Sequence, residues 1–198
     1  MILRPWVILL AAGGSRRFGG PKLLVRIQRE SLLRRAARVA LGCRPAGCVV
    51  VLGAHARRLE RELRGLPVRV AINRRWRAGL SQSLRAGIGA LPRGAPAALV
   101  LLADQAAIGP ADLALLIAAW QREPRAIVAA RAAEVRGPPV VLPRTTFGAL
   151  RRLRGDAGAR KLLADPRWRV IEVEIPGAAW DVDQPTDLTQ IPGFRVLP

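Results

Sequence analysis

The chain has few cysteines and histidines, and this scarcity excludes several kinds of site. Its 198 residues include two cysteines and one histidine. Cys43 and Cys48 have no further Cys or His clustered near them, so they fit neither a disulfide framework nor a zinc site, and we expect buried free thiols. No serine lies in a G-x-S-x-G elbow, which excludes a serine hydrolase of that kind, so His55 is expected at a helix start or on the surface.

Long hydrophobic runs are also missing. The longest, such as residues 97–103, fall short of the roughly 20 residues that a membrane-spanning helix needs. The apolar run at 6–12 is followed by a stretch rich in Gly and Arg instead of a small-residue cleavage site, which argues against a secretory signal. We therefore expect a cytoplasmic protein with no membrane partner.

Acidic residues are scarce as well. The chain has 14 Asp and Glu against 33 Lys and Arg, a formal charge of +19, yet 51% of its residues are hydrophobic. A disordered basic tail combines high charge with low hydrophobicity, so this chain is expected to fold. Its length predicts a single domain over residues 1–198.

The basic charge raises the alternative of a nucleic-acid-binding protein. Arginines are spread along nearly every predicted helix, and no zinc finger, basic zipper or aromatic RNA-binding signature is present. We interpret most of the charge as solvated helix surface. We therefore expect no specific nucleic-acid partner, and nucleic-acid binding is kept as the rival interpretation from a different class.

Short buried runs alternate with longer amphipathic stretches, which is the pattern of an α/β protein. Strands are predicted at 6–12, 48–52, 68–72, 97–103, 126–130, 139–142 and 170–175, and helices at 31–42, 55–64, 80–91, 110–121, 145–153 and 157–164, the first capped by Ser31. This order predicts a three-layer α/β/α fold with a mostly parallel, Rossmann-like sheet that binds ligands at the carboxyl ends of its strands. Residues 131–143 are expected to form a small inserted β-hairpin with its turn at 136–139.

A glycine-rich loop with three cations follows the first predicted strand. Its sequence is AAGGSRRFGGPK, residues 11–22. Glycines let backbone N–H groups approach an anion closely, and Arg and Lys add charge for phosphate oxygens. The spacing matches neither G-x-x-x-x-G-K-[ST] nor G-x-G-x-x-G. The loop therefore predicts a phosphate site of a third kind.

Carboxylates follow two later apolar stretches. Asp104 ends the predicted strand 97–103, where a carboxylate suits Mg²⁺, which binds through one or two carboxylates and substrate phosphates. Asp181 and Asp183 alternate along an extended piece, so we expect only one of them to face the site and choose Asp183 as the second metal ligand. Asp187 is expected in the first turn of a final helix.

Other polar residues near the predicted strand ends have two interpretations each. Asn73 is suited either to reading a base or ribose edge or to a local side-chain turn. Ser81 and Ser83 lie where a helix begins, so either is expected to cap it, and a helix start also helps to hold an anion. Asp156 and Arg160 are expected either to pair or to contact the substrate that accepts the transferred group.

Five stretches, in order, resemble the signature of MobA-like nucleotidyltransferases, and most of all the molybdenum cofactor cytidylyltransferase branch. They are LAAGGSRRFGGPK (10–22), NRRWRAGLSQSL (73–84), LLADQ (101–105), GDAGAR (155–160) and DVDQPTD (181–187). Two positions depart from that pattern. Ala106 stands where the family usually has Pro after Asp-Gln, and Pro138 stands where it often has His.

The resemblance implies a Mg²⁺-dependent enzyme that transfers CMP from CTP to the phosphate of molybdopterin and releases pyrophosphate, with a molybdoenzyme as a further partner. It implies catalytic roles for Arg17, Lys22 and Asp104 and metal binding by Asp104 and Asp183. The nucleotide is expected to contact Leu10, Ala11, Ala12, Gly13, Gly14, Ser15, Arg17, Lys22, Asn73 and Ser83. Transfer to another phosphorylated acceptor, or an accessory role in maturing a molybdenum hydroxylase, stays open.

Overall fold

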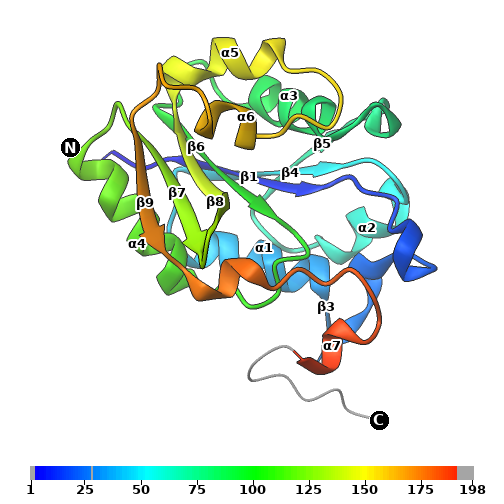
Figure 1. Ribbon diagram of the computed structural model, residues 1–198. Coiled ribbons are helices and arrows are strands. Elements are labelled where there is room, and N and C mark those ends of the chain that lie inside the picture. The colour runs from blue at the N-terminus through cyan, green and yellow to red at the C-terminus, as the bar shows by residue number, and fades with distance from the viewer. Residues whose placement is uncertain (1–2, 28, 191–198) are drawn as a thin grey trace.

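The computed structural model describes residues 3–27 and 29–190, and a seven-stranded sheet runs through it (Figure 1). The strand order is β5-β4-β1-β6-β8-β7-β9. Every neighbouring pair is parallel except the two pairs that β8 makes with β6 and β7. The strands are β1 (Trp6–Ala11), β4 (Gly47–Leu52), β5 (Arg69–Ile72), β6 (Ala97–Leu102), β7 (Ile127–Ala132), β8 (Val135–Pro143) and β9 (Val170–Glu174). The predicted α/β fold with a mostly parallel sheet is confirmed.

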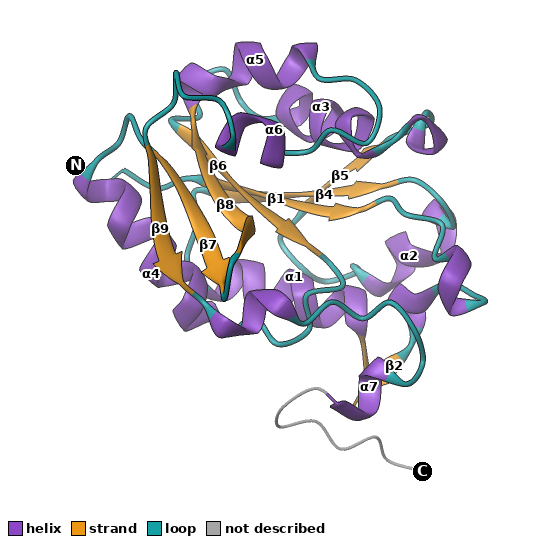
Figure 2. Cartoon of the chain, in the orientation of Figure 1, coloured by secondary structure: helices purple, strands orange, loops and turns teal. Residues whose placement is uncertain are grey.

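Helices cover both faces of the sheet (Figure 2). One face packs against α1 (Leu32–Gly42), α2 (Ala56–Glu62) and α4 (Pro110–Arg122), and the other packs against α3 (Leu80–Ala90), α5 (Phe147–Arg152) and α6 (Arg160–Leu163). Successive side chains of a strand point to opposite faces, so β1 contributes to two hydrophobic cores. Val7 and Leu9 lie in one core, and Ile8 and Leu10 lie in the other. Both faces of β1 are therefore buried, which fixes the loop that follows it.

The residue that caps the start of α1 was predicted correctly, whereas the residue that caps the start of α3 was not. Ser31 caps α1 as predicted, since its Oγ accepts from the Arg34 N–H. Neither Ser81 nor Ser83 caps α3, so that expectation is wrong: the cap is Gly79, at φ 101°. A Cβ there would overlap the Gly155 carbonyl, so the closely packed loop at Gly155 requires glycine at this position. His55 precedes α2 and is exposed, as predicted.

The hairpin predicted within 131–143 exists, but the predicted position of its turn is wrong. Strands β7 and β8 are joined at Ala133, at φ 51°, and Glu134, whereas residues 136–139 lie inside β8. Pro138 and Pro139 fall where the register shifts, because Ala129 pairs with Val140 while Ala130 pairs with Gly137. Proline has no N–H to donate, so a bulge is where a strand tolerates it.

A second, smaller hairpin was not predicted. Its strands, β2 (Arg26–Ile27) and β3 (Glu30–Ser31), lie between the glycine loop and α1. The chain also forms short 3-10 helices, of which η1 (Arg16–Phe18), η2 (Lys22–Leu24) and η5 (Pro176–Ala179) lie near the cleft described below. No helix of the described residues has both the length and the apolar character needed to cross a membrane.

Candidate active site

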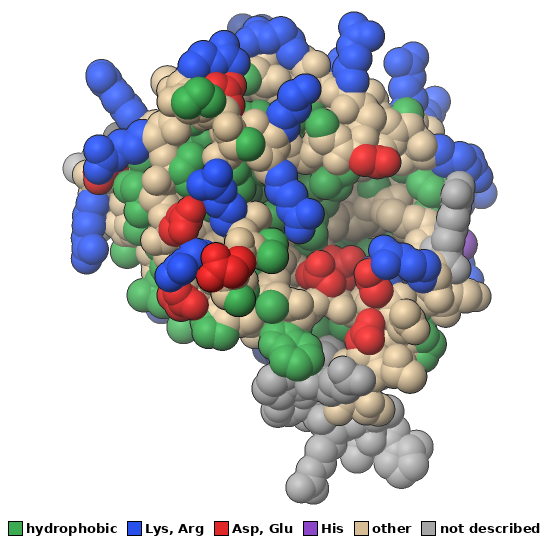
Figure 3. Space-filling model, viewed as in Figure 1, with side chains coloured by type: hydrophobic (Ala, Val, Ile, Leu, Met, Phe, Trp, Pro, Cys, Tyr) green, Lys and Arg blue, Asp and Glu red, His purple; other side chains and the backbone are tan. Residues whose placement is uncertain are grey.

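A cleft opens where β1 and β6 end, as expected for the carboxyl edge of a parallel sheet. Its cavity has a volume of about 510 Å³. It brings together nine of the predicted site residues: Leu10, Ala11, Gly13, Gly14, Ser15, Arg17, Lys22, Asp104 and Asp183. Figure 3 shows acidic side chains gathered in this hollow, while Lys and Arg side chains are scattered round the rest of the face.

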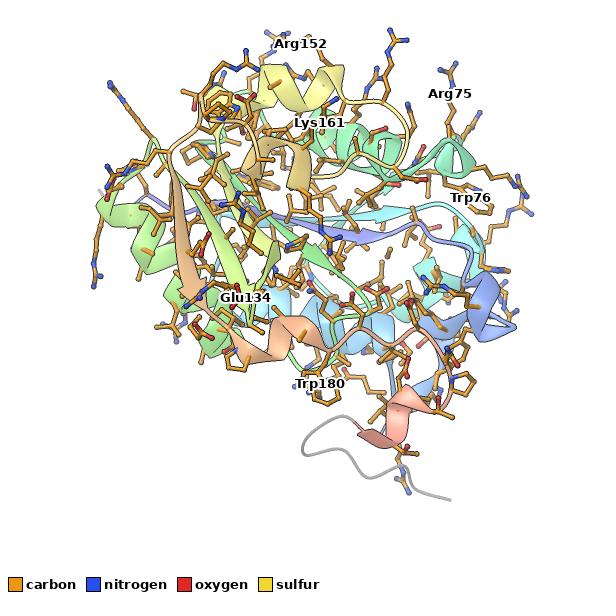
Figure 4. The ribbon with its side chains drawn as sticks, in the orientation of Figure 1. Arg75, Trp76, Glu134, Arg152, Lys161 and Trp180 are labelled. Carbon is orange, nitrogen blue, oxygen red and sulfur yellow. The ribbon has the colours of Figure 1, made fainter. Side chains whose placement is uncertain are left out.

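A second cavity of about 460 Å³ continues the cleft and shares Leu10, Gly13, Gly14 and Asp104 with the first. It adds Ala12, Ser83 and Trp76. Figure 4 places Trp76 near the end of β4, whereas Arg75 points away from the molecule. Together the two cavities form an elongated cleft with a charged half and a more apolar half.

The glycine loop presents unpaired backbone donors to the cleft. Within the described residues, the N–H groups of Gly13, Gly14 and Ser15 have no protein acceptor. The Trp76 ring packs directly on Gly14, where an added Cβ would lie 2.9 Å from a ring carbon. Successive free N–H groups beside basic side chains form a concave anion site. The loop therefore has the properties that the sequence predicts for a phosphate site.

Lys22, at the start of η2, lies at the centre of the charged half of the cleft. Its Nζ donates to Asp104 Oδ2 at 2.6 Å, to the Val182 carbonyl at 2.7 Å and to Asp183 Oδ1 at 3.2 Å. Only 12% of its side chain is exposed. Burial lowers the pKa of Lys22, but Asp104 and Asp183 together raise it by more, so the net shift is upward. The ammonium is therefore held in its charged form.

Arg17, in η1, supplies the second cation. Its guanidinium lies 2.9 Å from Asp183 Oδ2, and 75% of its side chain is exposed. Two cations, Arg17 and Lys22, thus meet two carboxylates, Asp104 and Asp183, and the four charges sum to zero. Arg17 is free to move toward a ligand at little cost, because an exposed ion pair is worth less than about 1 kcal/mol.

Residues 180–183, which follow η5 and are called the acidic segment below, are held in place by residues that follow β6. The Val182 N–H donates to the Asp104 carbonyl at 3.0 Å. Gln105 is buried, and its Nε2 donates to the Pro138 carbonyl at 2.9 Å and to the Ala178 carbonyl at 3.4 Å. Gln105 was not predicted as a positioning residue; its signal in the sequence is its place directly after Asp104.

The α7 helix (Asp187–Gln190) fixes the other side of the same segment. Asp187 Oδ2 accepts from the N–H groups of Asp183 and Gln184, both at 2.7 Å. These two hydrogen bonds lower the pKa of Asp187. Asp187 is in the first turn of the final helix, as predicted, and it orients the backbone that carries Asp183.

Asp181 does not line the first cavity, but it interacts electrostatically with the other carboxylates. Desolvation raises the pKa of Asp181 to about 6, and the charges of Asp104 and Asp183 add to this effect, while Lys22 and Arg160 oppose it. Asp183 lines the first cavity and Asp181 does not. Residues two apart in an extended segment lie on the same face, and both side chains line a further cavity beside Arg17, so alternation does not separate them. The choice of Asp183 as the metal ligand stays a prediction.

Asn73 and Ser83 are bonded to each other. Asn73 Nδ2 donates to Ser83 Oγ at 3.0 Å, and Asn73 Oδ1 accepts from the Arg75 N–H at 2.9 Å. Asn73 is buried and lines neither cavity. The structure thus shows the local side-chain turn, and contact of Asn73 or Ser83 with a nucleotide stays a prediction.

Asp156 and Arg160 are both exposed, and these two described side chains form no ion pair with each other. Asp156 lines both cavities.

The two carboxylates of the cleft fit a divalent cation. Asp104 and Asp183 both contact the single ammonium of Lys22, so one cation can reach both. Among the described residues, no group of three or more Asp, Glu, His or Cys side chains gathers to hold a metal. A site of two hard oxygen ligands suits Mg²⁺ or Mn²⁺, with the remaining ligands coming from water and substrate phosphates.

A mostly parallel sheet, a glycine loop with free N–H groups, two cations and two carboxylates together fit a nucleotidyltransferase. The chain belongs to the family with the MobA-like NTP transferase domain, whose model matches residues 7–171.

The chain is also similar to named proteins and to solved structures. The purine catabolism protein PucB of Bacillus subtilis (strain 168) is 28% identical over 197 residues, covering 93% of this chain and 94% of PucB. The crystal structure of Rv0371c from Mycobacterium tuberculosis H37Rv is 28% identical with a TM-score of 0.85, covering 96% of this chain and 98% of that one. A complex of Rv0371c with manganese, 27% identical and covering 95% and 97%, has a TM-score of 0.80.

Proposed function

We propose that the protein transfers CMP from CTP to the phosphate of a molybdopterin-type acceptor, with Mg²⁺ bound and pyrophosphate released. The observation that carries this proposal is the meeting of Arg17, Lys22, Asp104 and Asp183 beside the free N–H groups of the glycine loop. This arrangement joins donors for phosphate oxygens with ligands for a divalent cation. The choice of CTP and molybdopterin rests on the resemblance of the Ala11-Ala12-Gly13 loop to the cytidylyl branch.

In the proposed reaction an oxygen of the acceptor phosphate attacks the α-phosphorus of CTP. The new bond joins that oxygen to the α-phosphorus, the bond between the α-phosphorus and its bridging oxygen to the β-phosphate breaks, and pyrophosphate leaves with the electron pair. No covalent intermediate on the protein is needed. Arg17 and the N–H groups of Gly13, Gly14 and Ser15 bind the β- and γ-phosphates, and Lys22 neutralises charge at the α-phosphate. Catalysis then comes from positioning and electrostatic stabilisation.

In this proposal Asp104 and Asp183 hold Mg²⁺. A bound divalent cation would neutralise charge on the phosphate oxygens as the transition state forms. The relative Rv0371c has been crystallised with manganese, which supports a divalent cation in this family fold. Gln105 and Asp187 contribute by fixing the backbone that carries Asp183.

The second cavity is the proposed site of the base and ribose. Leu10, Ala12 and Gly13 line it, and Trp76 gives it an apolar wall. Ser83 also lines this cavity, and the hydrogen bond from Asn73 Nδ2 holds the Ser83 hydroxyl in place. Asp156 lines both cavities and Arg160 acts electrostatically on Asp181, so in this proposal both are near enough to the reacting groups to contact the acceptor.

A second candidate is an accessory role in maturing a molybdenum hydroxylase. The name of PucB, a purine catabolism protein, favours it, because hydroxylation of purine carbons is chemistry for such an enzyme. Transfer to another phosphorylated acceptor uses the same cleft. The two transfer reactions share the nucleotide step and differ in the acceptor, so they are distinguished by adding each acceptor to a pyrophosphate-release assay. A purely accessory role predicts no pyrophosphate release with either acceptor.

The nucleotide is tested first, by a thermal-shift panel of CTP, GTP, ATP and UTP with Mg²⁺. A nucleotide present at 100 times its Kd stabilises the folded state by about 2.7 kcal/mol, which a thermal shift detects. We expect CTP to give the largest shift, and equal shifts for all four would contradict the choice of CTP. A flat panel would overturn the nucleotidyltransferase proposal.

Pyrophosphate release tests the assigned residues. Lys22→Ala and Asp104→Asn are each expected to lower the rate by about 10²–10³, the usual effect of removing one preorganised electrostatic contact. Lys161→Ala removes the chain's other lysine, which is exposed on α6 and lines neither cavity, and is the matched control. Near-normal turnover in Lys22→Ala or Asp104→Asn would refute the roles of these residues.

A further inference from the structure

We propose that Lys22 acts as an internal counter-ion that occupies the divalent-cation site of the nucleotide-free protein and leaves it only when a nucleotide phosphate attracts its ammonium. The divalent cation then binds together with the nucleotide and not before it. This inference rests on the proposed function, because it takes Asp104 and Asp183 as the metal ligands.

The hydrogen bonds of Lys22 carry the first step. An ammonium has three N–H donors, and here all three have acceptors: Asp104 Oδ2, the Val182 carbonyl and Asp183 Oδ1. No donor is left for a phosphate. Lys22 therefore cannot contact a nucleotide phosphate while it keeps this arrangement, and at least one contact to a carboxylate or to Val182 has to break.

The position of the ammonium carries the second step. It lies within hydrogen-bonding distance of both carboxylates, 2.6 Å from one and 3.2 Å from the other. A cation bound by Asp104 and Asp183 together has to lie between them, which is where the ammonium is. The two cations therefore exclude each other by overlap and by charge repulsion.

The local charge balance carries the third step. Arg17 and Lys22 pair with Asp104 and Asp183, so the two proposed metal ligands have little uncompensated charge to offer a divalent cation. A nucleoside triphosphate changes this balance, because its phosphates attract both cations. Once Lys22 and Arg17 pair with phosphates, two uncompensated carboxylates face the cleft, and a divalent cation is bound by them and by the phosphates.

The chain also provides a short path for the exchange. Lys22 follows the glycine loop directly and lines the same cavity as Gly13, Gly14 and Ser15, whose N–H groups are free. The four-carbon stem of lysine moves its charge by rotation about side-chain bonds, with the backbone of η2 unchanged. The ammonium thus has two sets of partners within one cleft.

The wild-type chain allows a direct test, because Lys22 and Lys161 are its only lysines. Protein labelled with ¹⁵N-lysine gives at most two side-chain ammonium signals, and Lys161→Gln assigns them. We expect a protected Lys22 signal that Mg²⁺ alone leaves in place and that CTP with Mg²⁺ shifts. A Lys22 signal that is absent in the nucleotide-free protein, that moves with Mg²⁺ alone, or that stays unmoved by CTP with Mg²⁺ would overturn the proposal.

Metal affinity gives the second readout, measured as Mn²⁺ binding to nucleotide-free protein. Lys22→Met removes the charge and keeps the stem, so the Kd for Mn²⁺ is expected to fall about tenfold, while Lys22→Arg keeps the charge and the weak binding of the wild type. Equal affinity in Lys22→Met and wild type would overturn the counter-ion role.

Asp104→Asn separates this inference from the function on which it rests. It is expected to weaken Mn²⁺ binding in the Lys22→Met background. If Asp104→Asn has no effect there, Asp104 is not a metal ligand and the proposed function fails with it. If Asp104→Asn weakens binding but Lys22→Met does not strengthen it, the metal site stands and the counter-ion role alone is refuted.

Discussion

Replacing Gln105 with leucine removes the hydrogen bonds that join the loop after β6 to β8 and to η5, the 3-10 helix that precedes the acidic segment. Its Oε1 accepts from the Leu102 N–H at 3.4 Å, and its Nε2 donates to the carbonyls of Pro138 at 2.9 Å and Ala178 at 3.4 Å. Leucine has a similar volume, so the substitution opens no large cavity. The effect therefore measures the polar contacts.

The expected loss of stability follows from those distances. Each hydrogen bond contributes about 0.5–1.5 kcal/mol net, and the two bonds at 3.4 Å belong at the lower end of that range. The sum is about 2 kcal/mol. For a chain of this size, about 1 kcal/mol shifts Tm by roughly 2–4 °C, so Tm is expected to fall by roughly 4–8 °C.

Thermal unfolding and pyrophosphate release are measured on the same samples. Gln121→Leu is the matched control: Gln121 lies on the surface of α4, where its Nε2 donates one hydrogen bond to the Leu3 carbonyl. It is expected to change stability by less than about 0.5 kcal/mol. Gln105→Leu is also expected to lower turnover about tenfold, because the segment that carries Asp183 loses its contact at Ala178 and small misplacements of reacting groups are costly. A Tm equal to that of Gln121→Leu, or full turnover, would refute the positioning role.

Three further predictions concern other parts of the molecule. Gly14→Val is expected to abolish nucleotide-induced thermal stabilisation, because its side chain would collide with the Trp76 ring; unchanged stabilisation by CTP would contradict the packing. Asp187→Asn is expected to raise the metal concentration needed for half-maximal turnover, because the carboxylate that accepts from the Asp183 and Gln184 N–H groups is lost. An unchanged concentration would show that α7 does not position the site. Burial raises the pKa of Cys43 to about 11 and that of Cys48 to about 12, so the thiolate fraction of both is small at pH 8. Alkylation by iodoacetamide is therefore expected to be slow until the pH approaches these values. Rapid alkylation of the folded protein at pH 8 would contradict this.

The residues of the cleft could be predicted because they follow strands. Lys22 and Asp104 follow β1 and β6 in the chain, and parallel strands bring their carboxyl ends to one edge of a sheet. The hydrogen-bond partners of these side chains could not be predicted. The three hydrogen bonds of Lys22 join positions up to 161 residues apart, and no periodicity along the chain encodes such a contact.

The hairpin shows why one local prediction was wrong. Residues 136–139 contain Gly137, Pro138 and Pro139, which by composition predict a turn. The prolines instead lie in the bulge of β8, and the turn falls at Ala133, which adopts a left-handed conformation without being glycine. Pairing of β8 with both β6 and β7 outweighs the local preference. The position of the turn is therefore set by strand pairing and not by the local turn residues.

The bond between Lys22 and the Val182 carbonyl also has a consequence for folding. It closes a loop of 160 residues, so it forms only after most of the chain has reached its native arrangement. The entropic cost of such a closure grows only slowly with loop length, but long-range contacts slow folding. A chain trapped before the 180–183 segment docks would carry the glycine loop and still lack Asp183 in the cleft. Catalytic activity would then appear with the last folding step, so the rate at which turnover recovers during refolding reports the docking of this segment.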